Sequence, residues 1–214
     1  MAETIVELMT DVADAIREKK GSNEPINAQS FAEEIKNLPS SGDLDIVIKP
    51  LTDVIKGATQ EDTPYELTIG GKITIVGVSA FSGDKRIVKV IIGGIVNKID
   101  INAFMGCTNN ASVELLSALT HIEANAFNNN ALTSIVLPST LTNIASNAFS
   151  NNNNLSKVIC NAPTPPRMWA LSFENNADGR LIYVPDESVE AYKAATNWAT
   201  YADAIRPMSE LPNE

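Results

Sequence analysis

The chain has 214 residues, of which 44% are apolar, 20% charged and 6% aromatic, and its 26 acidic and 16 basic side chains give a net charge of -10. This apolar content argues against wholesale disorder, and the negative charge argues against nucleic-acid binding, because phosphate groups would repel the chain. No run of 18 apolar residues occurs, so the sequence predicts no membrane span.

The first 40 residues carry the period of an amphipathic helix. Gly21 and Pro39 are typical of positions just after a helix end, and Asn27 between them is typical of an N-cap. We therefore expect a helical hairpin over residues 1–40. We interpret it as an attachment module that docks on the rest of the chain or on another chain. The apolar positions of its first helix are Ile5, Leu8, Val12 and Ile16.

The start of the sequence lacks the basic segment and apolar stretch of a secretory signal, which predicts synthesis in the cytoplasm without a signal peptide. Residues 41–66 come next, and their Ser- and Gly-containing beginning is typical of a linker. We expect the remainder of this segment to begin the sheet and to cover the first end of the repeats that follow.

The dipeptide Ala-Phe then recurs four times, and a Ser-Phe pair follows as a fifth, degenerate copy. The spacings between successive Phe residues are 23, 23, 22 and 24. The residues at fourteen, twelve, eight and five positions before each of the first four Phe are all Ile, Leu or Val, so the repeat keeps its phase. The recurring aromatic residues are Phe81, Phe104, Phe127, Phe149 and Phe173.

Positions fourteen and twelve before Phe differ by two, which places them on one face of a short strand; positions eight and five belong to a second extended piece. The Asn and Gly clusters after each Phe supply turns. One repeat cannot bury its own aliphatic side chains, whereas stacked repeats share a continuous core. The sequence therefore predicts a mainly β solenoid over residues 67–178.

These repeats resemble the BspA-like leucine-rich repeat family, whose usual pattern is LxxIxIPxxVxxIGxxAFxxC. The segment from Leu132 to Phe149 and the segment Phe104-Met-Gly-Cys107 carry the resemblance. The chain departs from the pattern at Asn110, which replaces the leading Leu of one repeat. The resemblance implies a leucine-rich-repeat solenoid of ~23-residue repeats that binds a protein or a glycan.

Residues 14–35, inside the expected hairpin, are similar to a helical leader of phage and prophage tail-region proteins. This second resemblance implies a virion or tail-associated protein. It would also account for a surface-type repeat in a chain that begins without a signal peptide.

Residues 179–214 are expected to form a C-terminal strand and helical cap, and the stretch from Tyr183 to Tyr192 with Trp198 resembles the C-terminal cap of the same repeat family. A last strand is predicted from Leu181 to Pro185, and Asp186 is expected to cap a helix. Both tryptophans, Trp169 and Trp198, are interpreted as cap or core residues rather than as residues that stack on a ligand. The helix is expected to contain Val189 and Tyr192, with Trp198, Tyr201 and Ile205 packed behind it.

The sequence contains no pattern typical of catalysis or metal binding, and we predict no enzyme activity, no cofactor and no metal. His121 is the only histidine, and its place beside the core residue Ile122 predicts a side chain that faces solvent. Cys107 and Cys160 are too few for a disulfide framework or a tetrahedral metal site. We interpret them as small buried residues.

The outer face of the main sheet is the candidate partner-binding site. The residue between positions fourteen and twelve points away from the core, and a second outward residue lies two positions earlier. Several of them are aliphatic, which favours coverage by a partner, although strands also carry scattered surface Val and Ile for propensity alone. The candidate residues are Thr68, Lys89, Ile91, Ser112, Glu114, Ser134, Val136, Lys157 and Ile159.

From these features we expect a non-enzymatic structural or binding protein with no nucleic-acid partner. The leading hypothesis is a phage or prophage virion component that presents its repeat surface to a protein or a glycan. The alternative is a bacterial surface protein of the BspA-like type, active in adhesion or host interaction. A homo-oligomer formed through the N-terminal helices or through the sheet face is compatible with both.

Overall fold

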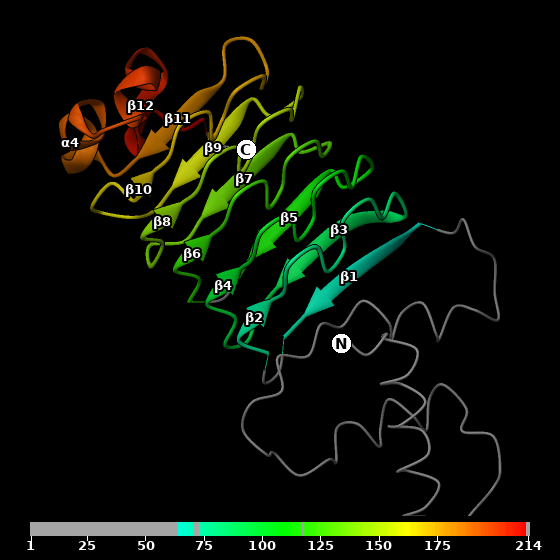
Figure 1. The fold of residues 1–214 in the computed structure, drawn as a ribbon. Coiled ribbons are helices and arrows are strands. Elements are labelled where there is room, and N and C mark those ends of the chain that lie inside the picture. Colours follow the sequence, from blue (N-terminus) through cyan, green and yellow to red (C-terminus); the bar gives the residue numbers. More distant parts are fainter. Residues whose placement is uncertain (1–63, 71–72, 117, 213–214) are drawn as a thin grey trace, which may run out of the picture. The chain divides into compact units, whose positions relative to one another are not determined.

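The computed structural model describes residues 64–70, 73–116 and 118–212, where the chain stacks as two rows of parallel strands (Figure 1). The main row contains the longer strands, and each successive strand pairs in parallel at the predicted phase within its sheet. Its members are β1 (Tyr65–Ile69), β3 (Ile87–Ile92), β5 (Ser112–Leu115), β7 (Ser134–Leu137), β9 (Lys157–Cys160), β11 (Leu181–Val184) and β12 (Ile205–Pro207).

The second row is a continuous five-stranded sheet of two-residue strands, all parallel. Each strand contributes one buried residue, which occupies the position five before Phe. The aliphatic residues eight before Phe lie outside these strands, in the preceding turns. The strands are β2 (Ile75–Val76), β4 (Lys98–Ile99), β6 (His121–Ile122), β8 (Asn143–Ile144) and β10 (Arg167–Met168).

The main row is divided between β5 and β7. These strands follow one another in the stack (Figure 1). However, one hydrogen-bonded sheet contains β1, β3 and β5, while another contains β7, β9, β11 and β12. Just before the two strands, the amide of Ala131 donates to the carbonyl of Asn110 at 3.0 Å. The division, which we call the seam, coincides with Asn110 in the leading-Leu position and with a repeat shortened by one residue.

The recurring phenylalanines form a continuous stack through the core. Successive ring centroids are 5.2 to 5.5 Å apart, with interplanar angles of 4° to 7°. This spacing is close to the strand spacing of about 4.8 Å, because each turn adds one strand and one ring. Phe173 takes part like the others, so the fifth repeat, which looks degenerate in sequence, is complete in the core.

Two residues of every turn adopt left-handed backbone conformations, with φ between 53° and 76°. They lie two positions before and two positions after each Phe. Gly, Asn and Ser tolerate this region better than other residues, which explains the Asn-rich turns. The exception is Leu171, with φ of 62°. The positions before Phe are Ser79, Asn102, Asn125, Asn147 and Leu171, and those after it are Gly83, Gly106, Asn129, Asn151 and Asn175.

The C-terminal end covers the last turn with short helices and one further strand. The segments are η1 (Asp186–Ser188), α4 (Val189–Ala194), η2 (Trp198–Ala204), β12 and η3 (Met208–Glu210). Trp198 is fully buried and lies 6.2 Å from Phe173 between ring centroids, and Tyr201 meets the same ring edge-on at 6.0 Å. These two aromatic residues therefore terminate the phenylalanine stack.

Two expectations for this end were wrong. Asp186 does not cap α4; its Oδ1 accepts a hydrogen bond from the amide of Ser209 at 3.0 Å, and α4 begins without a side-chain cap. The strand β11 is also not the last, because Ile205 belongs to β12, which pairs with β11 on its outer side. The hairpin predicted over residues 1–40 and nearly all of the segment 41–66 lie outside the described residues.

Candidate partner-binding face

The nine candidate residues all point away from the core, in two columns that cross the main row. None of them is buried, and the strand register aligns them from turn to turn on each side of the seam. The first column contains Lys89, Ser112, Ser134 and Lys157, and the second contains Thr68, Ile91, Glu114, Val136 and Ile159. The orientation predicted from the two-residue period is therefore confirmed, while partner binding stays a prediction.

Exposure varies along this outer face. Val136 is 47% exposed, whereas Ile91 and Ile159 are half-buried. Lys89 forms an ion pair with Glu114 across the columns, and this hydrogen bond holds the pKa of Lys89 above its ordinary value. The face thus combines aliphatic side chains with an internal ion pair, and the seam crosses it between Glu114 and Val136.

A second polar column runs along the outside of the second row. Lys98, His121, Asn143 and Arg167 are register partners in β4, β6, β8 and β10. The exposed His121 confirms the sequence prediction, and its Nδ1 lies 2.9 Å from Thr120 Oγ1. Lys98 Nζ lies 3.2 Å from Asp100 Oδ2 and 3.9 Å from Glu123 Oε1, so this cation is neutralised by neighbours.

Sequence reasoning missed a hydrogen-bond ladder beneath the turns. The side chain three positions after each Phe donates to the carbonyl of the Phe in the preceding turn. Three amides do so at 2.8 to 2.9 Å, and the Cys107 thiol does so at 3.1 Å. The donors are Cys107, Asn130, Asn152 and Asn176, and the acceptors are Phe81, Phe104, Phe127 and Phe149. The signal was present in the sequence as the family's terminal Cys position.

Each end of this carbonyl ladder has a charged residue. At the first turn Asp84 takes the donor's place and instead accepts from Arg86 and from the Tyr65 hydroxyl. Burial raises the pKa of Asp84, but these hydrogen bonds outweigh burial and hold it below the ordinary value. At the last turn Arg180 Nη1 donates to the Phe173 carbonyl at 2.8 Å, and the ladder ends there.

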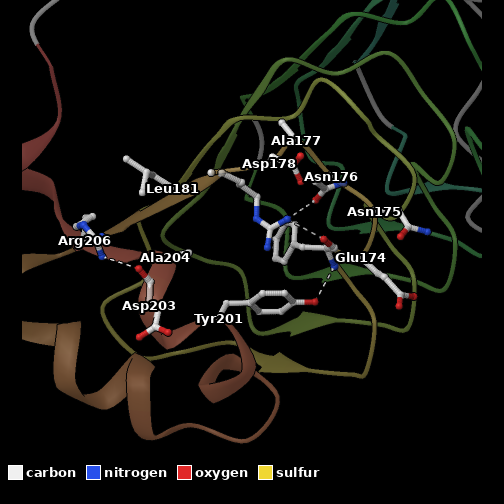
Figure 2. A pocket seen from close by; sticks show the side chains of 13 residues that line it. Glu174, Asn175, Asn176, Ala177, Asp178, Leu181, Tyr201, Asp203, Ala204 and Arg206 are labelled. Carbon is white, nitrogen blue, oxygen red and sulfur yellow. Dashed lines mark hydrogen bonds between the residues drawn. The ribbon is translucent and has the colours of Figure 1, made fainter.

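An open hollow of about 620 Å³ lies beside this last rung (Figure 2). Tyr201 extends across it, and its hydroxyl accepts a hydrogen bond from the Phe173 amide at 3.4 Å. The Arg180 guanidinium lies 4.9 Å from the centre of the Tyr201 ring, and burial lowers the pKa of Arg180. The hollow is therefore lined by the groups that close the core, and its arginine already has a structural role.

The two tryptophans differ, contrary to the sequence prediction. Trp198 is fully buried, and its indole N–H donates to the Pro166 carbonyl at 2.7 Å. Trp169 is 43% exposed and lies just after β10, so its interpretation as a core residue was wrong. The reason is the two-residue alternation around β10: Met168 points into the core, which leaves both Arg167 and Trp169 outside.

Chemically active groups are sparse in the described part of the chain. No cluster of three or more His, Cys, Asp or Glu side chains that could hold a metal lies within residues 64–70, 73–116 and 118–212. Helices in these same ranges are too short or too polar to cross a bilayer. Both cysteines are buried as expected, and each also makes a hydrogen bond; burial raises the pKa of the Cys160 thiol.

Comparison with known protein families places these repeats in a described family. The model described as BspA type Leucine rich repeat region matches six copies over residues 65–178, which is more than half of the chain. These residues contain all of the strands from β1 to β10. A comparison with curated proteins finds no match.

Proposed function

Since the chain belongs to the BspA type leucine-rich repeat family, we propose that it is a non-enzymatic binding protein whose main row presents its outer face to a protein partner. The observation that carries this proposal is the pair of outer columns. They offer aliphatic side chains at a regular strand spacing, flanked by Lys89, Glu114 and Lys157. An apolar surface with a charged rim suits a protein interface.

Site-directed photo-crosslinking tests this proposal in the producing cell. A benzophenone amino acid at Val136 should capture a protein partner of the full chain. The same group at Val78 should not, although Val78 is 58% exposed and thus even more accessible. Crosslinks that form from Val78 and not from Val136 would reject the proposed face.

The charge substitution Val136→Glu provides a second test with the captured partner. Its dissociation constant should rise at least about tenfold, because a carboxylate would lose its water at the interface without gaining an opposite charge. The matched variant Val78→Glu should bind as the unchanged chain does. Equal binding by all three proteins would mean that the columns are ordinary solvated sheet.

The setting we propose is a phage or prophage virion, and its support is the resemblance of residues 14–35 to tail-region leaders. Induced particles, purified by density gradient and analysed by mass spectrometry, should contain the chain. Its absence from particles together with its detection on the cell surface would favour the alternative, an adhesion or host-interaction protein. Light scattering during size-exclusion chromatography of the full chain tests the accompanying proposal of a homo-oligomer.

A further inference from the structure

The last turn carries large side chains where the earlier turns carry small or polar ones. Trp169 directly follows β10. The equivalent position after β8, β6 and β4 is held by Ala145, Glu123 and Asp100, respectively. Two residues later, Leu171 is 50% exposed at the left-handed position. Earlier turns expose single apolar residues after β2 and β4, namely Val78 and Ile101, whereas this turn exposes both Trp169 and Leu171 on the outside of the second row.

The backbone conformation of Leu171 has a cost. A left-handed conformation is unfavourable for a residue with a branched side chain, because its Cβ approaches the following carbonyl oxygen, and Asn tolerates it better. The preceding three turns use Asn at this position. The Ser150 hydroxyl donates to the Leu171 carbonyl, which helps to hold the conformation. An exposed leucine in strained backbone gains nothing from core packing, and such strain concentrates at functional sites.

Trp169 and Arg167 are held in a defined arrangement. The guanidinium carbon of Arg167 lies 4.3 Å from the centre of the Trp169 ring. The indole N–H donates to Asn143 Oδ1 at 3.3 Å, which orients the ring from the neighbouring turn. Stacking uses the face of the guanidinium, so the N–H groups in its plane stay available.

Arg167 has no ion pair and no side-chain hydrogen bond within the part of the chain that the structure describes. The nearest acidic residues along the outside of the second row, Glu123 and Asp100, are at the position of Trp169 two and three turns away, and both pair with Lys98. The cluster thus offers a fixed cation without a counter-ion, beside exposed apolar surface. A carboxylate is its natural complement, because planar guanidinium and carboxylate groups pair through two parallel hydrogen bonds.

We propose that Arg167, Trp169 and Leu171 form a second binding site that takes a carboxylated saccharide. The carboxylate pairs with Arg167, and the C–H groups of the sugar ring lie against the exposed indole and leucine. The small area favours a saccharide: a stable protein interface buries about 800 Å² on each partner, far more than three side chains supply. The site lies on the second row and is independent of the face proposed for the protein partner.

Tryptophan fluorescence gives a direct readout, because the chain has two tryptophans and Trp198 is fully buried. The full chain is titrated with a trisaccharide of galacturonic acid. A saturable change in emission is expected, with affinity at least about tenfold higher than for the neutral trisaccharide of galactose. Absence of saturation, equal affinity for the neutral sugar, or tighter binding of triglutamate would overturn the proposal; the last outcome would indicate a peptide ligand.

Substitutions test whether Arg167 and Trp169 bind the trisaccharide. Arg167→Gln should weaken binding of the acidic trisaccharide about tenfold or more, whereas Lys98→Gln, a change in the same column, should leave it unchanged. Trp169→Ala, followed by calorimetry because the fluorophore is lost, should abolish binding. Circular dichroism should show that these exposed variants fold. Unchanged binding in either cluster variant would contradict the proposal.

Leu171→Asn separates a binding role from a structural one. This variant should raise the midpoint of thermal unfolding, because Asn tolerates the left-handed backbone, and should also weaken binding of the trisaccharide. A raised midpoint with unchanged binding would remove Leu171 from the site and count against the proposal.

Discussion

Asparagine occupies two kinds of position in each turn, and the two kinds have different physical reasons. At the left-handed positions its backbone matters, since Asn tolerates positive φ better than most residues. In the carbonyl ladder its side chain matters, because a buried carbonyl without a partner is destabilising. Asn152 shows the second kind: its Nδ2 donates to the carbonyls of both Phe127 and Phe149 at 2.9 Å.

Replacing Asn152 should therefore be costly. We expect Asn152→Ala to lower the free energy of unfolding by about 1–3 kcal/mol, because the buried Phe127 carbonyl loses its side-chain donor, while the Phe149 carbonyl keeps Asn176. Urea denaturation followed by circular dichroism measures this change. Asn153→Ala at the exposed neighbour should stay within about 0.5 kcal/mol of the unchanged chain. Similar values for both variants would show that the ladder contributes little.

Asn110 is a buried polar residue whose side chain is only partly hydrogen-bonded. It is fully buried at a position where the other repeats place Ile87, Leu132 and Leu155, and its Oδ1 has no hydrogen-bond partner. Its Nδ2 donates to the buried Asn130 Oδ1 at 3.0 Å, so Asn110→Leu is combined with Asn130→Cys, which removes that acceptor and keeps a ladder donor of the Cys107 type. We expect this double variant to raise the free energy of unfolding by about 1 kcal/mol, since an unsatisfied buried amide oxygen is exchanged for an apolar side chain. Differential scanning calorimetry should show a higher midpoint, and a lower one would refute this reasoning.

At the scale of elements, each turn contributes one strand to each row, one ring to the stack and one rung to the ladder. The interior rungs are neutral, whereas the ends use Asp84 and Arg180. The buried Asp84 carboxylate is compensated by Arg86 and the Tyr65 hydroxyl, whereas the interior rungs pair neutral amides or a thiol with carbonyls. The two ends should consequently respond differently to pH.

The Asp84 end should weaken in acid. Its pKa in the folded chain lies below the ordinary value of 3.8, so the ionised carboxylate stabilises the fold above that value. This contribution is lost as the pH falls through the lowered pKa. The thermal unfolding midpoint of Asp84→Asn, measured from pH 7 to about pH 2, should be lower than that of the unchanged chain at neutral pH. It should also fall less than that of the unchanged chain as the pH is lowered. Asp178→Asn, at an exposed site, should follow the unchanged chain; a parallel curve for Asp84→Asn would disprove the effect.

At the scale of the molecule, a stack of turns needs a cover wherever it stops. Trp198 provides one at the C-terminal end, together with Tyr192, whose ring it meets edge-on at 4.8 Å. We expect Trp198→Ala to lower the free energy of unfolding by about 3–5 kcal/mol, the cost of removing a large buried aromatic residue. Trp169→Ala should cost much less, because its ring is partly solvated. Comparable losses in urea denaturation would contradict the assignment of these roles.

The structural features that recur in every repeat are the ones that the sequence predicts best. A pattern that occurs several times predicts the spacing from Phe81 to Phe173, the two rows of strands and the outward columns. One irregular turn does not change these predictions, because the other turns repeat the pattern. Features that occur once could not be predicted in this way. Three such features depend on how the last turn ends: the exposure of Trp169, the strand β12, and the hydrogen bond from Arg180 to the Phe173 carbonyl. The carbonyl ladder repeats, but its Cys and Asn members share a bond geometry rather than a residue type.

The seam gives the stacked turns a mechanical weak point. The three strands before it and the four after it are separate hydrogen-bonded sheets, while the second row runs past it unbroken. Separating the two blocks there requires fewer backbone hydrogen bonds to break than separating any paired strands of the main row. Under tension between residues 65 and 207, the solenoid should therefore lengthen in two steps, with the first opening between β5 and β7.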